Sequence, residues 1–106
     1  MLKETKRFWI YITASEPRGV LYIGMTSDLA GRTWQHREHV MQGFTSKYGV
    51  DRLVYFEEHS DAAFAARRER AMKRWRRDWK IEKIEKFNPT WRDLFPDVVR
   101  AEGYEP

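Results

Sequence analysis

The strongest constraint on the fold is a pair of strand-like segments near the N-terminus, residues 8–12 and 20–24. Both are rich in β-branched and aromatic residues, which favour β-strands. Five of the seven residues between them are typical of a turn, Ser15-Glu16-Pro17-Arg18-Gly19. The pattern predicts an antiparallel hairpin. Because an isolated hairpin is marginally stable in water, other elements must pack against it.

The rest of the chain supplies those elements. Capping residues precede a predicted helix over about residues 29–41, and a third strand is expected at 52–56. Two further helices are expected, one from Ser60-Asp61 to about residue 77 and one over about 78–87, which Asn88-Pro89 ends. We therefore expect an α/β fold with a small three-stranded, mainly antiparallel sheet flanked by about three helices.

Length and composition indicate one domain. The chain has 106 residues, of which 42% are hydrophobic, so we expect a single domain over residues 1–95 and a loose tail over 96–106. The absence of cysteine excludes disulfides and thiol catalysis and fits a cytoplasmic protein. No apolar run approaches the ~20 residues of a membrane span, so we expect no membrane partner.

Two tripeptides and four single residues form a recognisable pattern. Trp9-Ile10-Tyr11 and Tyr22-Ile23-Gly24 lie on the two hairpin strands, and four polar residues follow them, Arg32, His36, Glu69 and Asn88. The pattern resembles the GIY-YIG nuclease superfamily, most closely its small single-domain branch, over about residues 8–95. It is also similar to the incision domain of the bacterial excision-repair nuclease, which suggests DNA repair. One departure is that Trp9 stands where the signature has its first glycine.

The resemblance implies a metal-dependent endonuclease that hydrolyses DNA phosphodiester bonds. It implies five catalytic residues, namely Tyr11, Tyr22, Arg32, His36 and Asn88. Tyr22 would act as general base or orient the water, Arg32 would contact the phosphate, and Asn88 would brace the site more than react. Glu69 would be the single protein ligand of Mg²⁺ (or Mn²⁺), which prefers oxygen ligands and retains several waters.

Each of these residues also has a structural interpretation. Tyr11 and Tyr22 could pack in the core, and His36 could border it. His36 and His39 have helical spacing for a metal site, but no third nitrogen or sulfur ligand is evident. Glu69 falls at the border of the apolar arc of its helix, where it could face the site or pair with a cation such as Lys73.

Basic residues are concentrated in the second predicted helix and just after it. Eight basic residues and two acidic ones lie between residues 67 and 80, while the net charge of the whole chain is +4. We expect a nucleic-acid-binding surface that includes Arg67, Arg70, Lys73, Arg74 and Arg77, with DNA favoured over RNA. The alternative is a solvated helix face.

Three functions are therefore compared. The first is an endonuclease, and the second is a non-catalytic nucleic-acid-binding module with the same fold. The third is a protein-interaction domain in which Trp75, Trp79 and Trp91 form a partner surface. The sequence favours the first.

Overall fold

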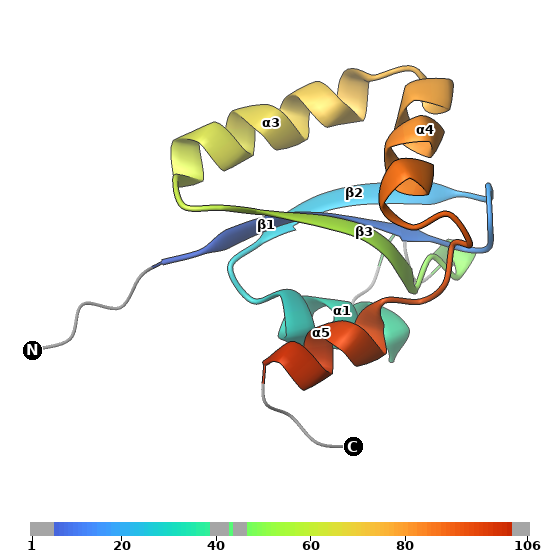
Figure 1. Cartoon of the computed structure of the whole chain (residues 1–106), viewed down its shortest axis with the longest axis horizontal. Helices are drawn as coiled ribbons and strands as arrows, with labels where there is room; N and C mark the ends of the chain where they lie inside the picture. The colour runs from blue at the N-terminus through green and yellow to red at the C-terminus, as the bar shows by residue number, and fades with distance from the viewer. Residues whose placement is uncertain (1–5, 39–42, 44–46, 103–106) are drawn as a thin grey trace, which may run out of the picture.

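The computed structural model describes residues 6–38, 43 and 47–102, which form a sheet covered by helices on both faces (Figure 1). The elements are β1 (Phe8–Ala14), β2 (Leu21–Thr26), α1 (Leu29–Arg37), β3 (Arg52–His59), α3 (Ala62–Arg74), α4 (Arg77–Phe87) and α5 (Phe95–Ala101). The strands are antiparallel in the order β2-β1-β3. The predicted hairpin, third strand and α/β class are confirmed.

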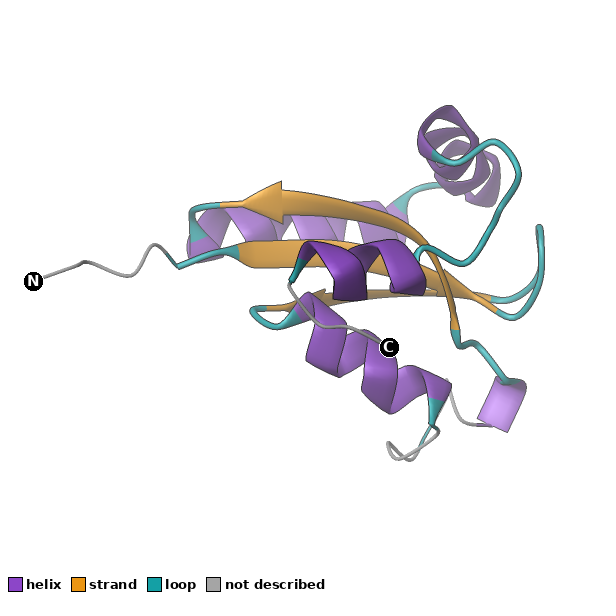
Figure 2. Cartoon of the chain, turned by 60° about the horizontal axis from the view of Figure 1, so that its bottom comes forward, coloured by secondary structure: helices purple, strands orange, loops and turns teal. Residues whose placement is uncertain are grey.

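The central strand β1 explains why both faces of the sheet need a cover. Residues 9–14 are all buried, and successive side chains point to opposite faces. Ile10 and Ile12 pack with Met72 of α3 and Ile84 of α4. Tyr11 packs on the other face, where α1 and α5 lie (Figures 1 and 2). The sheet therefore separates an α3–α4 layer from an α1–α5 layer.

The predicted helix starts are confirmed by their caps. The Asp28 carboxylate accepts a hydrogen bond from the backbone N–H of Gly31 at 3.0 Å, and Asp61 accepts one from Ala63 at 2.8 Å. Helix α1 ends at Arg37. Its predicted last turn, with His39, falls on residues 39–42, which lie outside the described residues.

Two expectations about the C-terminal half were wrong. Helix α3 does not reach residue 77, because Trp75 and Arg76 adopt extended backbone with ψ of 149° and 150°, and α4 begins directly after them. In addition, most of the expected loose tail forms a fourth helix, α5. Pro96 stands in the first turn of α5, where proline is well tolerated, and Val98 is buried. This short helix is stabilised by packing on α1 more than by intrinsic propensity.

Within the described part of the chain, none of the helices combines the length and the apolar character that crossing a lipid bilayer requires.

Candidate active site

Three aromatic rings from β1, β2 and α1 meet on the α1–α5 face of the sheet. The ring centroids of Tyr11 and Tyr22 are 6.2 Å apart, and those of His36 lie 5.6 Å from Tyr11 and 5.5 Å from Tyr22. The Oη atom of Tyr11 is 2.9 Å from Nε2 of His36. Tyr11 and His36 are buried, while Tyr22 is half-buried. The sequence prediction that these three side chains lie together is thus consistent with their geometry.

The position of Tyr11 depends on the glycine opposite it. The hairpin register pairs Tyr11 with Gly24. A Cβ atom on Gly24 would lie 2.5 Å from Oη and 2.6 Å from Cζ of Tyr11, far inside normal contact. Gly24 therefore allows the phenol ring of Tyr11 to lie across β2 toward its neighbours. The sequence pattern alone does not indicate this packing role of Gly24, although a hairpin register that pairs Gly24 with Tyr11 would predict it.

Arg32 extends this cluster, in which burial is the main influence on the protonation of Tyr11 and His36. Arg32 lies one helical turn before His36 on the same face of α1, and its charge and hydrogen bonding act on Tyr11. Burial, followed by the neighbouring Tyr22, nevertheless raises the pKa of Tyr11, so Tyr11 stays a neutral phenol. Burial, reinforced by Arg32, lowers the pKa of His36.

Tyr11 and His36 are joined by the buried hydrogen bond in their uncharged forms. A neutral imidazole has one donor and one acceptor nitrogen, so the tautomer of His36 decides whether the Tyr11 hydroxyl donates to Nε2 or accepts from it. This arrangement holds Tyr11 and His36 rigidly behind the more accessible Tyr22.

Glu69, the predicted metal ligand, lies in α3. It is therefore on the face of the sheet opposite to the tyrosine–histidine cluster (Figure 1). Its side chain is only 18% exposed, and its Oε1 atom is 3.4 Å from Nζ of Lys73. The i, i+4 ion pair considered from the sequence therefore forms. The sheet therefore stands between Glu69 and the tyrosine cluster, and β2 is one of its edge strands. Among the described residues, no three His, Asp or Glu side chains gather into a metal-binding group.

Comparison with known proteins decides the family. Residues 7–85 match the family model of the GIY-YIG catalytic domain, which covers most of the chain. The chain belongs to the GIY-YIG family. Searches among curated proteins and among solved structures each found no match. Because GIY-YIG domains are generally nucleases that act on nucleic acid, membership indicates a nuclease-type function in general.

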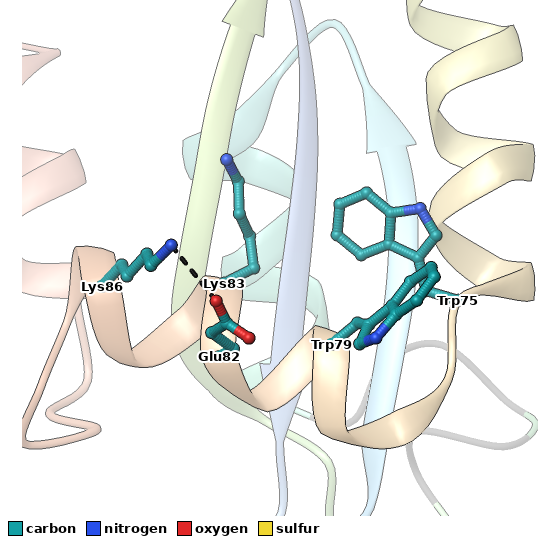
Figure 3. A pocket seen from close by; sticks show the side chains of 5 residues that line it. All are labelled: Trp75, Trp79, Glu82, Lys83 and Lys86. Carbon is teal, nitrogen blue, oxygen red and sulfur yellow. Dashed lines mark ion pairs between the residues drawn. The ribbon is translucent and has the colours of Figure 1, made fainter.

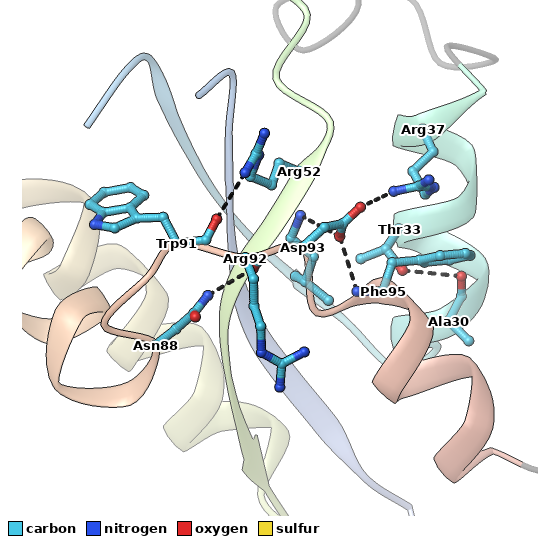
Figure 4. A network of polar contacts seen from close by, with 10 residues as sticks. Ala30, Thr33, Arg37, Arg52, Asn88, Trp91, Arg92, Asp93 and Phe95 are labelled. Carbon is cyan, nitrogen blue, oxygen red and sulfur yellow. Dashed lines mark hydrogen bonds and ion pairs between the residues drawn. The ribbon is translucent and has the colours of Figure 1, made fainter. Parts of the chain in front are cut away.

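Asn88 of this GIY-YIG domain is buried at the end of α4, where it joins three segments (Figure 4). Its Nδ2 atom donates to the carbonyl oxygens of Val54 at 3.2 Å and Arg92 at 2.8 Å. Both contacts are to backbone, so Asn88 holds β3 and the loop that follows α4 in position. The part that Asn88 plays at the site stays a prediction.

Asp93 is a second bracing residue, and no pattern in the sequence indicates a role for it. Its carboxylate accepts hydrogen bonds from Arg37 at the end of α1, from the backbone N–H of Leu53 at 3.3 Å and from that of Phe95 at 3.0 Å (Figure 4). Asp93 thus ties α1, β3 and α5 together. It fixes the helix that carries Arg32 and His36.

The basic residues of this GIY-YIG domain differ in their environment. Four of them are exposed along α3, Arg67, Arg70, Lys73 and Arg74. Arg77 instead donates from Nη2 to the carbonyl oxygens of Arg18 and Gly19, the latter at 2.7 Å, and so supports the hairpin turn. Arg77 therefore has a structural role in addition to its charge.

The three tryptophans considered as a partner surface differ in their exposure to solvent. Trp91 is 3% exposed and belongs to the core, and Trp75 packs against the core with Ile81. Trp79 alone among these three is largely exposed, at 52%. They do not form one shared surface.

Proposed function

We propose that this chain is a metal-dependent endonuclease that hydrolyses phosphodiester bonds in DNA. The observation that carries the proposal is the cluster in which Tyr22 and Arg32 lie against the buried Tyr11–His36 hydrogen bond. Family membership supports a nuclease, and the cluster supplies groups suited to the chemistry. Hydrolysis of a phosphodiester needs an activated water, positive charge at the phosphate and stabilisation of the leaving oxygen.

The accessible members of the cluster would contact the substrate. Tyr22 is half-buried and lies beside Tyr11 and His36, and it would orient the attacking water or accept its proton. Arg32 would bind the scissile phosphate through its forked donors, since its guanidinium is permanently charged. Tyr11 and His36 would hold the two in position, with His36 also able to hydrogen-bond the phosphate.

The free edge of β2 would unite the two faces of the sheet. In the part of the chain that the structure describes, no strand lies outside β2, so a phosphate at that edge could meet Tyr22 and Arg32 from the α1 side and Glu69 from the α3 side. A single, mostly buried carboxylate is a fitting ligand for Mg²⁺ or Mn²⁺, which keeps several waters. A bound ion would supply positive charge to the phosphoryl oxygens. The exposed partner Lys73 would leave Glu69 at little cost.

The exposed basic residues of α3 would contact the flanking phosphates. These residues are Arg67, Arg70, Lys73 and Arg74, with Arg77 at the end of the row. Contacts of this kind do not read sequence, so recognition would be guided by DNA structure. A cytoplasmic role in DNA repair fits such a substrate.

A cleavage panel tests the proposal. Purified protein with Mg²⁺ or Mn²⁺ should cut at least one of nicked, branched, single-stranded or duplex DNA. Cutting should disappear with a chelator and with Glu69→Ala, while Glu58→Ala, which replaces an exposed glutamate of β3, should leave cutting normal. Binding that weakens steeply with salt, without any cutting and without change on Glu69→Ala, would instead identify the non-catalytic binding module.

A further inference from the structure

A hollow in the angle between α3 and α4 combines aromatic and basic side chains (Figure 3). It measures about 320 Å³ and is lined by Trp75, Trp79, Glu82, Lys83 and Lys86. Trp75 and Trp79 lie next to each other where the chain turns from one helix into the next. The two lysines continue along α4 over the sheet. None of these residues belongs to the tyrosine–histidine cluster.

The two indoles have different freedom. The indole of Trp75 is already covered by other side chains. It packs against the core, and the guanidinium carbon of Arg68 lies 5.1 Å from the centroid of its ring. Trp79 is 52% exposed, and the nearest cation over its ring is Arg76, 5.8 Å from the centroid. The Arg76 side chain is 71% exposed and can move away. Trp79 therefore offers an aromatic face, with Trp75 as a side wall.

Charge beside this face favours phosphate. Lys83 and Lys86 follow Trp79 at i+4 and i+7, so all three lie along one face of α4. Lys86 pairs with Glu82 at 3.2 Å, but both side chains are well exposed, so a phosphate can replace the carboxylate at little cost. Lysine is depleted in the cores of protein–protein interfaces, which makes a protein partner a poorer fit.

We propose that this hollow binds single-stranded nucleic acid, stacking one unpaired base on Trp79 while Lys83 and Lys86 contact the adjacent phosphates. Stacking on aromatic side chains beside a basic track is the usual way in which proteins hold unpaired strands without reading sequence. The inference deepens the proposed function, because it adds an unpaired segment to the DNA structure that the enzyme acts on. It explains why a large aromatic ring is kept exposed among cations.

Equilibrium binding without metal tests the inference independently of cleavage. The probe is a short oligothymidine, whose bases remain unpaired, and a duplex of equal length is the comparison. Trp79→Ala should weaken oligothymidine binding roughly 10-fold, while Trp79→Phe keeps much of the affinity because it retains a ring. Trp34→Ala is the matched control, since Trp34 is 49% exposed on α1, away from the hollow. All variants are first compared by circular dichroism to verify folding.

The lysines are tested by salt dependence. Replacing Lys83 and Lys86 by glutamine should reduce the slope of log affinity against log salt by about 0.7 for each lost phosphate contact on a single strand. The inference is overturned if Trp79→Ala binds oligothymidine like the wild type, if Trp34→Ala loses as much, or if duplex binding falls equally. Failure of the wild type to bind oligothymidine overturns it too, while metal-dependent cleavage of other DNA would leave the proposed function standing.

Discussion

At the scale of single residues, the site depends on a glycine as much as on its reactive groups. Gly24 leaves the space through which Tyr11 reaches His36, and a Cβ atom there would lie 2.5 Å from the Tyr11 hydroxyl. The site therefore couples backbone packing in β2 to the position of a hydroxyl on β1.

Gly24→Ala should consequently displace Tyr11. We expect a loss of about 1–3 kcal/mol in the free energy of unfolding, measured by urea denaturation, because the extra methyl group overpacks the site. In a Tyr11→Ala background the same substitution should cost much less, since the obstructing ring is gone. An equal cost in both backgrounds would contradict the assigned contact.

His36 should make stability depend on pH. Burial lowers the pKa of His36 in the folded chain below its unfolded value of 6.5, so below that value the unfolded state binds the additional proton. The contribution of neutral His36 to the free energy of unfolding is therefore full above pH 6.5, the unfolded pKa, and declines as the pH falls below it. Urea denaturation between about pH 7 and about pH 5 should show a steeper decline for the wild type than for His36→Gln. Parallel profiles would refute this.

At the scale of elements, α3 is anchored to the sheet by a polar contact inside its apolar side. Arg68 donates two hydrogen bonds to Glu57 of β3, at 3.0 and 3.2 Å. Burial raises the pKa of Glu57, but hydrogen bonds from Arg68, Tyr55 and His59 outweigh it and lower the value to about 2. The helix that carries Glu69 is thus fixed by a charged pair.

Arg68→Ala should destabilise the fold by about 2–3 kcal/mol at neutral pH, because it leaves the Glu57 charge poorly compensated. Arg67→Ala, an exposed neighbour, should change stability by under about 0.5 kcal/mol. The stabilising effect of Glu57 is full above its unfolded pKa of 4.5 and is lost toward about 2, so the difference between wild type and Arg68→Ala should shrink in acid. A constant difference would contradict the pair.

The elements that were predictable were those with local signals. The hairpin turn and the caps Asp28 and Asp61 are visible in sequence, and the structure confirms all three. The break at Trp75–Arg76 has no Gly or Pro, and α5, which begins at Phe95 with Pro96 in its first turn, is held by packing on α1. Both depend on tertiary contacts, which local patterns do not contain.

At the scale of the whole molecule, the sheet divides the candidate site into two halves. The tyrosine cluster and Arg32 lie on the α1–α5 side, and Glu69 lies on the α3–α4 side. The sequence suggested that these residues belong together, but it could not indicate that a strand stands between them. The proposed function therefore requires a phosphate at the free edge of β2 that both halves reach.

Single-turnover cleavage by Tyr22→Phe, Glu69→Gln and the double variant tests this requirement most directly. Groups that act on one phosphate as a unit have non-additive effects. We predict that each single variant loses about 100-fold or more in rate and that the double variant is no slower than the worse single one. The account would be contradicted if the rate losses of the two single variants multiply in the double variant, or if Glu69→Gln cleaves at the wild-type rate. Either result would mean that the two residues do not share one site across the β2 edge.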